Sequence, residues 1–239
     1  MARGVDPLDP PPPWSATTLL GQVSPLAQAD LVRLGAHRQY DTGEILIHQG
    51  AEQRFALLLL SGFVKITVQA DSEQQILLTI RGQGDLIGDL AALSGQRRSA
   101  TVVACTPIKA RLIFHHTLRE FTERNREVGE LIIGLVVTQL HTANRRRVEF
   151  ATRNAPQRLA SVLLELAATC GKPLPDSGIQ LPNWFSQTEL ANLVGSSEDS
   201  VQRALRDLRT QGMVSTGYRQ LTIIDPEGLA EVIQPTSPS

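Results

Sequence analysis

Between residues 40 and 114 the apolar residues fall into short runs, separated by turns that contain glycine. The runs are rich in the branched and aromatic residues that strands favour, and no helical repeat lies between them. They are EILIHQ, FALLLL, FVKITVQ, QILLTI, ATVVA and ARLIF. Six or more strands at this spacing predict an antiparallel β-roll or barrel.

After Phe114 the period becomes helical, with a short helix expected over residues 116–123 and a long one from about Arg126 to Ala151. One set of positions in the long helix recurs at alternating steps of three and four: Ile133, Val136, Leu140, Ala143, Arg147 and Phe150. This spacing is typical of one seam of a coiled coil. Because one small β-roll covers so long a helix poorly, the seam predicts a dimer interface; an intramolecular core helix is the alternative.

A second domain is expected from Asn154, because Pro156 stops the long helix and can open a new one. Its first part is expected to hold a helix over residues 156–170, a loop over 171–178 and a short strand in IQLP. The stretch QTELANLVGSSEDSVQRALR then places Ala191, Gly195 and Val201 four and six residues apart. Two helices that cross closely need a small residue, a glycine in the turn and an apolar lock at this spacing. With a two-stranded hairpin expected in the residues that follow, the stretch predicts a winged helix-turn-helix; a plain helical hairpin is the alternative.

The second helix of this motif carries the candidate DNA contacts. Ser197 can cap it, and Glu198 and Asp199 lie in its first turn, where the helix dipole favours carboxylates. Arg203 is the best candidate for reading a guanine edge. The residues expected at DNA are Ser197, Glu198, Asp199, Ser200, Gln202, Arg203, Arg206 and Arg219. Residues 154–239 hold six basic and nine acidic side chains, so binding to a polyanion depends on arginines focused on one face.

Residues 88–101, GDLAALSGQRRSAT, gather glycines, a carboxylate, two arginines and a serine in one stretch. A carboxylate and an arginine at this separation can hold the two ends of one small polar ligand; solvated loop charges are the alternative. A cyclic phosphodiester suits an arginine with a hydroxyl or backbone donors, and vicinal ribose hydroxyls suit a carboxylate acceptor.

The order of these parts resembles the cyclic-AMP receptor and fumarate-nitrate regulator (Crp/Fnr) family of bacterial transcription factors over about residues 20–225. By that resemblance, residues 88–101 are similar to the phosphate-binding cassette of its cyclic-nucleotide-binding members. Asp89 falls where a glutamate holds the ribose 2′-hydroxyl. Arg98 would pair with the cyclic phosphate and Ser99 would donate a hydroxyl to it, with Arg97 as the rival for the phosphate. The ligand contacts that the resemblance implies are Gly88, Asp89, Leu90, Arg98, Ser99, Ala100 and Asn144.

The chain departs from the family pattern at three places. Asp89 is one methylene shorter than the usual glutamate. On the long helix, Ala143 and Asn144 stand where the family uses two small polar residues to reach the adenine amine, and Ala143 has no polar side chain. Glu198 replaces an arginine at the start of the second helix of the motif, so one guanine contact should be lost, whereas Arg203 matches the family arginine. The base of the ligand is therefore open between adenine, guanine and another group.

The resemblance implies an α+β fold with an N-terminal antiparallel β-roll of the cyclic-nucleotide-binding jelly-roll type, a long dimerisation helix and a C-terminal winged helix-turn-helix. The expected divisions are a flexible proline-rich arm over residues 1–19, the β-roll over 20–125, the dimerisation helix over 126–153 and the DNA-binding domain over 154–239. The function implied is that of a homodimeric transcription regulator, controlled allosterically by cyclic AMP, with double-stranded DNA and RNA polymerase as further partners.

Two alternatives stay open. The first is a regulator that is constitutive or answers to cyclic GMP, cyclic di-GMP or another effector. The second is an enzyme that handles cyclic nucleotides, but the sequence has no glycine-rich phosphate loop, metal-spaced histidine and carboxylate cluster, or serine nucleophile elbow.

Composition narrows the picture further. The 239 residues carry a net charge of −1 and only two cysteines, so we expect neither a structural metal nor a resident cofactor. The longest apolar run has six residues, and the N-terminal stretch lacks the apolar core of a signal peptide, so we expect a cytoplasmic protein without a membrane partner. Arginines 145–147 could contact DNA backbone or pair with acidic residues of the β-roll, but we expect a solvated face.

Overall fold

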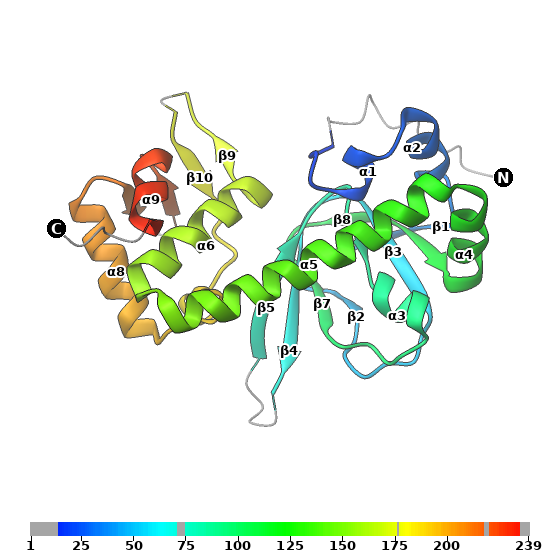
Figure 1. Ribbon diagram of the computed structural model, residues 1–239, viewed down its shortest axis with the longest axis horizontal. Coiled ribbons are helices and arrows are strands. Elements are labelled where there is room, and N and C mark those ends of the chain that lie inside the picture. The colour runs from blue at the N-terminus through cyan, green and yellow to red at the C-terminus, as the bar shows by residue number, and fades with distance from the viewer. Residues whose placement is uncertain (1–13, 71–74, 176, 218–219, 235–239) are drawn as a thin grey trace.

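The N-terminal half of the chain is built on two four-stranded antiparallel sheets, seen in Figure 1 of the computed structural model, which describes residues 14–70, 75–175, 177–217 and 220–234. The first sheet has the order β1 (Ala36–Tyr40), β8 (Ile108–Phe114), β3 (Phe55–Ser61) and β6 (Leu86–Ile87). The second has the order β2 (Ile45–Ile47), β7 (Thr101–Ala104), β4 (Val64–Gln69) and β5 (Gln75–Arg81). The predicted antiparallel β-roll is therefore confirmed.

The unbroken apolar run of β3 is explained by burial on both faces. Leu57 and Leu59 pack in the core shared by the two sheets, whereas Ala56, Leu58 and Leu60 pack on the opposite side against helices. Those helices are α1 (Leu19–Gln22), α2 (Pro25–Leu31), α3 (Asp89–Ser94), α4 (His115–Arg124) and the start of α5 (Arg126–Thr152).

Part of the predicted N-terminal arm is folded. Residues 1–13 lie outside the described residues, but Trp14 packs against the helical side of the β-roll and Thr18 caps α1 through the backbone N–H of Gly21. Residues 14–19 are thus held by apolar burial and a helix cap, which proline content alone does not reveal.

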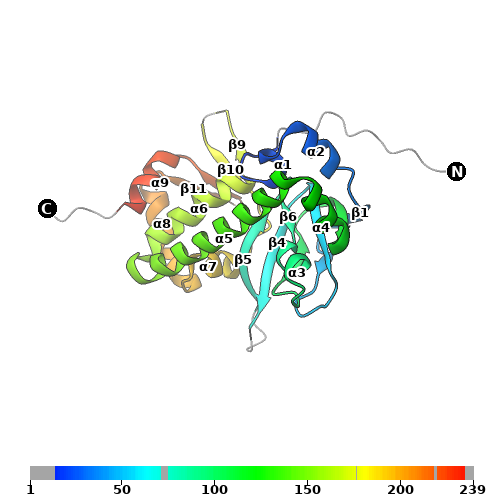
Figure 2. The same ribbon diagram turned by 45° about the vertical axis from the view of Figure 1, so that its right-hand side comes forward.

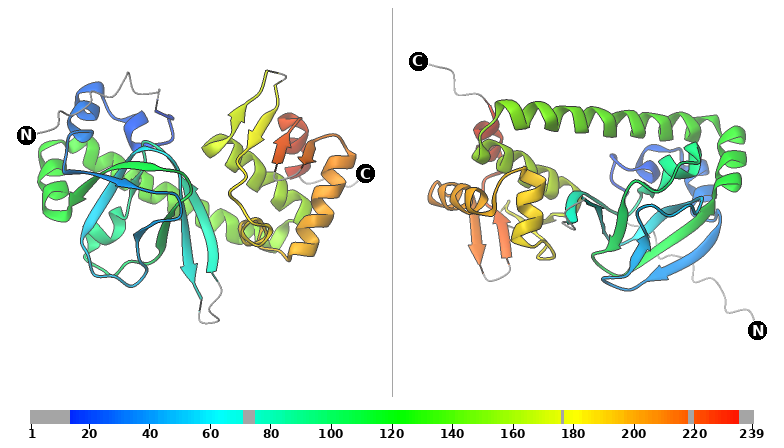
Figure 3. Two further views of the ribbon diagram at one scale, coloured as in Figure 1. Left: turned by 180° about the vertical axis from the view of Figure 1, so that it is seen from behind. Right: turned by 90° about the horizontal axis from the view of Figure 1, so that it is seen from below.

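Helix α5 has 27 residues, so it is about 40 Å long, and it joins the two lobes of the molecule. In the right-hand view of Figure 3 it lies along one side of both lobes. Val128 and Ile132 near its start are buried on the β-roll, whereas Ile133, Val137 and Leu140 are 64%, 45% and 60% exposed. A single chain therefore leaves an apolar stripe of α5 uncovered. The stripe shares Ile133 and Leu140 with the predicted seam, but Val137 is exposed where the seam had Val136, which is half-buried.

The C-terminal half begins at the predicted break. Asn154 and Gln157 form a capping box: Asn154 Oδ1 accepts from the Gln157 backbone N–H at 3.0 Å, and Gln157 Oε1 accepts from the Asn154 backbone N–H at 3.1 Å. The helices are α6 (Ala155–Cys170), α7 (Gln187–Val194), α8 (Glu198–Thr210) and α9 (Pro226–Ile233). The sheet has the order β11 (Val214–Gly217), β12 (Gln220–Ile223), β10 (Ile179–Leu181) and β9 (Lys172–Pro173).

Two features of this half differ from the sequence prediction. The segment expected to be a loop over residues 171–178 contains β9, because Lys172 and Pro173 pair with β10. These two residues do not form an apolar run, so the sequence pattern does not predict a strand there. Helix α9 was not anticipated; Asp225 caps it through the backbone N–H of Gly228, and Leu229 is buried.

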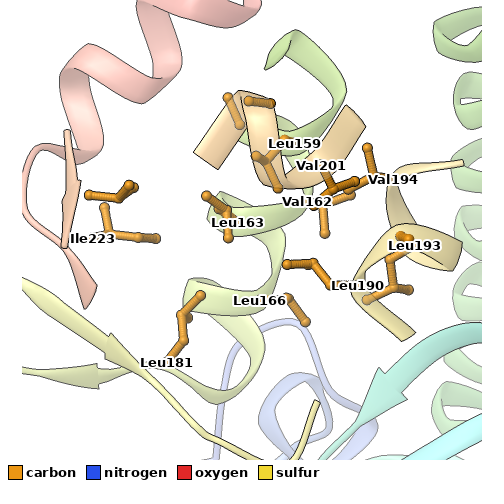
Figure 4. Close-up of a cluster of buried hydrophobic side chains, with 14 of the residues drawn as sticks. Leu159, Val162, Leu163, Leu166, Leu181, Leu190, Leu193, Val194, Val201 and Ile223 are labelled. Atoms are coloured by element: carbon orange, nitrogen blue, oxygen red, sulfur yellow. The ribbon is translucent and has the colours of Figure 1, made fainter. Parts of the chain in front are cut away.

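The core of the C-terminal half lies around α6. Figure 4 shows Leu159, Leu163 and Leu166 of α6 pointing toward side chains from α7, α8 and the sheet. The same buried cluster includes Leu77 and Ile80 of β5, so the apolar core of the C-terminal half extends onto the β-roll.

Polar contacts reinforce the junction of the lobes. Lys65 of β4 donates to Glu189 of α7 at 2.5 Å, with side chains only 26% and 19% exposed. Asn192 of α7 donates to the backbone carbonyl of Gln75 at 3.2 Å, and Figure 2 shows α7 beside β5. The helix-turn-helix therefore rests directly on the β-roll.

Candidate functional site

The segment 88–101 begins at a glycine with a left-handed backbone conformation. Gly88 connects β6 to α3 with φ +75°, in the left-handed region that only glycine adopts readily. A Cβ atom at this position would lie 2.6 Å from Nη1 of Arg98. Glycine is thus required here both by the backbone and by the approach of the Arg98 side chain.

Arg98 is the centre of the segment and is only 4% exposed. Its Nη1 donates to the Gly88 carbonyl at 2.8 Å, its Nη2 donates to the Phe55 carbonyl, and its Cζ lies 4.8 Å from the Phe55 ring centroid. Its Nε is buried without a partner among the described residues. Burial lowers the pKa of Arg98, and the nearby charge of Asp89 opposes this change. A buried cation with an N–H left over for a further acceptor suits an anionic ligand.

The backbone of Arg98 is also held on both sides. The Gly50 N–H donates to the Arg98 carbonyl at 2.8 Å, and the Arg98 N–H donates to the Ala51 carbonyl at 3.0 Å. The contributions of Phe55, Gly50 and Ala51 were missed at the level of sequence, because all three lie far from residues 88–101 along the chain and act mainly through backbone atoms.

Asp89 begins α3 and is 8% exposed. Burial raises the pKa of its carboxyl group, against the effect of the backbone N–H groups of Leu90 and Asp89 and of the positive charges of Arg81 and Arg98. A carboxylate acceptor and a guanidinium donor therefore lie in one buried site, as the sequence indicated for a ligand with a hydroxyl and an anionic end.

The other predicted ligand contacts are less enclosed. Ser99 is exposed, Leu90 is 49% exposed, and Ala100 is half-buried. Arg97 is exposed and pairs with Glu52 at 2.7 Å, so it is not the buried arginine of the site. Asn144 is exposed on α5, and no hydrogen bond found among the described residues connects it to residues 88–101.

The predicted helix-turn-helix is formed by α7 and α8. Gly195 ends α7 with φ +63°, and Ala191 and Val201 are buried where the two helices cross. Ser197 caps α8 by accepting from the Ser200 backbone N–H at 3.3 Å, as predicted. The buried side of α8 consists of Val201, Ala204 and Leu208.

The opposite side of α8 bears the candidate DNA contacts. Arg203 and Arg206 are exposed there with Asp199, and Gln202 and Ser200 are half-buried. Glu198 accepts from the Thr188 hydroxyl at 2.5 Å, which ties it to α7. Arg209 Nη1 lies 3.5 Å from the Thr216 hydroxyl of the hairpin and links α8 to the wing. The predicted contact Arg219 lies outside the described residues.

The expectation of a solvated face is wrong for Arg146. Its Nη1 donates to the Leu78 carbonyl of β5 at 2.7 Å, and its Nη2 donates to Glu165 of α6 at 2.7 Å. The side chain is only 22% exposed, because packing of α6 and β5 beside α5 brings both acceptors to it. Arg145 and Arg147 are exposed as expected.

Other site types find little support. Within residues 14–70, 75–175, 177–217 and 220–234, no group of three or more His, Cys, Asp or Glu side chains could hold a metal ion. In the same part of the chain, no helix is long and apolar enough to cross a membrane. Burial raises the pKa of the Cys105 and Cys170 thiols to about 12, so both are poor nucleophiles.

A β-roll joined by a long helix to a winged helix-turn-helix is the architecture of a DNA-binding regulator. The family model for the cyclic nucleotide-binding domain matches residues 37–125, and that for the Crp-like helix-turn-helix domain matches residues 157–232.

Whole-chain comparisons agree with these matches. The chain is 26% identical to a CRP-like cAMP-activated global transcriptional regulator of Mycobacterium tuberculosis, over 87% of this chain and 92% of the relative. It is 25% identical to the cAMP-activated global transcriptional regulator CRP of Salmonella typhimurium, over 84% of this chain and 95% of the relative. Among solved structures, a CRP/FNR-family transcriptional regulator from Thermus thermophilus has a TM-score of 0.68 at 22% identity, covering 83% of this chain and 98% of that one.

The chain therefore belongs to the Crp/Fnr family of transcription regulators and combines a cyclic nucleotide-binding domain with a Crp-like helix-turn-helix. The proteins it matches are transcription regulators, not enzymes, which confirms the family and class predicted from the sequence.

Proposed function

We propose that this chain is a homodimeric transcription regulator whose affinity for DNA is raised by a cyclic nucleotide bound between Asp89 and Arg98, with cyclic AMP as the first candidate. The observation that carries the proposal is the buried Arg98 guanidinium, whose Nε has no partner among the described residues and which lies beside a buried carboxylate. A cyclic phosphate supplies the anion and its ribose supplies the hydroxyl. The named activity of the relatives supports cyclic AMP.

The mechanism follows from the placement of α5. Its start is buried on the β-roll through Val128 and Ile132, and near its end Phe150 packs against Gly195 in the turn of the helix-turn-helix. A ligand that favours one position of α5 therefore favours one orientation of α8. In a dimer joined along the exposed stripe of Ile133, Val137 and Leu140, the favoured state would place two α8 helices about 34 Å apart, in successive major grooves.

Within this mechanism each candidate residue has a role. Arg98 would neutralise the phosphate, Ser99 and the backbone of Gly88 and Ala100 would donate to it, and Asp89 would accept from the ribose. Leu90 would border the site, and Asn144 of α5 would reach the base. On DNA, Arg203 and Arg206 would be the main side chains on base edges and phosphates, and Arg219, which lies outside the described residues, would be a further contact. Such a regulator would act in the cytoplasm, and activation would require RNA polymerase as a partner.

The direct test is isothermal titration calorimetry of the purified protein with cyclic AMP, cyclic GMP and cyclic di-GMP. We expect saturable binding of one ligand per chain, abolished by Arg98→Ala and weakened by Ser99→Ala, an exposed position whose substitution leaves the core intact. The control is Arg97→Ala, which removes the neighbouring exposed arginine and should leave affinity unchanged. If Arg98→Ala folds and binds as well as the unmodified protein, the proposed site is wrong.

DNA binding is tested separately, by fluorescence anisotropy on duplexes selected from a random pool. The ligand should raise affinity, and Arg203→Ala should cost about 1–3 kcal/mol at a single base pair. DNA binding that no cyclic nucleotide changes would favour the constitutive or differently liganded regulator, for which the shorter Asp89 and the apolar Ala143 are the motivating features.

The dimer is tested by sedimentation equilibrium. Leu140→Arg places a charge in the exposed stripe of α5, where the side chain is 60% exposed and its replacement leaves the fold of one chain intact. We expect this variant to be monomeric at concentrations where the unmodified protein is a dimer. A dimer of undiminished stability would refute the assignment of the stripe.

A further inference from the structure

A cavity of about 380 Å³ lies where α5 ends and α6 begins. It is separate from the Arg98 site, since none of its lining residues belongs to the segment 88–101. Charged side chains form much of its wall: Arg145, Arg146, Arg153, Arg158, Glu149 and Glu165. Its volume falls in the range of small-molecule sites, which begins at roughly 300 Å³.

The charges of this wall do not balance. Arg146 pairs with Glu165 at 2.7 Å, and Arg153 pairs with Glu149 at 2.7 Å. Arg145 reaches the same Glu149 only at 3.7 Å, and its side chain is 65% exposed. The four guanidinium groups therefore face two carboxylates, which leaves two positive charges without a carboxylate of their own in the cavity wall.

Arg158 is the second excess charge, and it holds the cavity in shape. Its Nε donates to the Val194 carbonyl at 3.0 Å, and its Nη1 donates to the Arg153 carbonyl at 2.8 Å. Backbone carbonyls satisfy its hydrogen bonds but leave its full charge uncompensated. One arginine thus fastens the end of α5 to the end of α7 and makes the cavity positive.

The shape and position of the cavity favour a small ligand over a DNA backbone. Val162, Leu193 and Ile233 close part of it with apolar surface, and none of the exposed arginines of α8 lines it. On α5, Arg145 and Glu149 lie about 110–150° around the helix from the stripe of Ile133, Val137 and Leu140, at roughly 100° per residue. Dimerisation along that stripe would leave the cavity open.

We propose that this cavity is a second effector site, which binds a small dianion such as a dicarboxylate or a phosphate compound. Two excess guanidinium charges match two negative charges, and Arg145 and Arg153 retain N–H donors for bidentate contacts. The ligand would touch α5, α6 and the end of α7 at once. It would therefore hold the end of α5 in a fixed position relative to the helix-turn-helix, whether or not a ligand occupies the Arg98 site.

The test is isothermal titration calorimetry with inorganic phosphate and with succinate at pH 8, where both are dianions, at constant ionic strength. We expect saturable binding of one dianion per chain and a loss of affinity of about tenfold or more in Arg145→Gln, whose exposed side chain can be replaced without loss of folding. Arg126→Gln is the matched control, because Arg126 also pairs with a glutamate four residues on along α5, Glu130, but lies outside the cavity. It should bind like the unmodified protein, as should Arg98→Ala.

The probe that binds more tightly identifies a phosphate or a carboxylate compound as the physiological source. The proposal is overturned if neither probe binds saturably, if Arg126→Gln weakens binding as much as Arg145→Gln, or if Arg98→Ala abolishes it. It is also overturned if Arg145→Gln lowers DNA affinity and its salt dependence while neither dianion binds, since the cavity arginines would then serve DNA phosphates.

Discussion

Phe150 near the end of α5 lies against Gly195 in the turn of the helix-turn-helix, and the strength of this contact can be measured. Gly195 has φ +63°, and a Cβ atom there would lie 2.4 Å from Cε1 and 2.8 Å from Cζ of Phe150. Alanine in the left-handed region costs about 1–2 kcal/mol. Forcing an extra methyl group into the packed ring costs about 1–3 kcal/mol more. We therefore expect Gly195→Ala to lower the free energy of unfolding by roughly 2–5 kcal/mol.

A double-mutant cycle separates the two terms. In a Phe150→Ala background the overlap is absent, so Gly195→Ala should cost only the backbone term, about 1–2 kcal/mol. Gly212→Ala is the matched control, because Gly212 has φ +77° and nothing lies within 4 Å of its Cβ position. It should also show the backbone term alone.

The assay is urea unfolding followed by the fluorescence of Trp184, which packs on Phe63 and Phe185, in a Trp14→Phe background that silences the second tryptophan. The reasoning is refuted if Gly195→Ala costs the same with and without Phe150, or no more than Gly212→Ala. Phe150 would then not press on the turn, and another contact would have to couple α5 to α7.

Three further predictions concern single groups. Burial raises the pKa of Asp89, so its carboxylate is lost at a higher pH than that of a free aspartate. We therefore expect cyclic-nucleotide affinity, followed by calorimetry, to fall as the pH is lowered and to begin falling above the pH at which a free aspartate titrates. Asp89→Asn should bind more weakly at pH 7 but without this pH dependence. For the free energy of unfolding without ligand, the effect of pH is opposite. A carboxyl group whose pKa is raised in the folded state favours folding at low pH, and this stability is lost as the pH rises through the folded-state pKa. Ligand-free Asp89→Asn should therefore be more stable than the unmodified protein at pH 7, and a less stable variant would contradict this. With the pKa of Cys105 and Cys170 raised to about 12, neither thiol should react with a disulfide reagent at pH 8 until urea unfolds the chain, whereas fast reaction in buffer would show that the lobes separate. Asn154→Ala removes half of the capping box of α6 and should lower the free energy of unfolding by about 1 kcal/mol, and an unchanged urea midpoint would show that the cap is dispensable.

Much of the architecture follows from local patterns. The apolar runs located six strands, because a strand buried on one or both faces leaves a short apolar segment between turns. Pro156 marked the start of α6, and the spacing of Ala191, Gly195 and Val201 located the crossing of α7 and α8. Strand β1 was missed because its residues are mostly exposed and polar, and β6 because two residues make no pattern.

The candidate site was predictable only in part. The composition of the segment 88–101 indicated a carboxylate and an arginine as ligand contacts, but residue type alone does not distinguish Arg97 from Arg98. The resemblance to the family favoured Arg98, and in the structure Arg98 turns inward to the carbonyls of Gly88 and Phe55, whereas Arg97 turns outward to Glu52.

The sequence by itself determined most of the elements of this protein, their order and the charged residues gathered in the segment 88–101, because these depend on neighbours close along the chain. The tertiary structure alone decided which groups are buried together. It placed Phe150 against Gly195, although its spacing belongs to the seam of α5, and it gave Arg146 two acceptors from elements far along the chain. It also gathered four arginines around one cavity at the junction of the lobes. Such contacts depend on how the elements pack in three dimensions. Packing brings together residues that are far apart in the sequence, and no periodic pattern along the chain connects them.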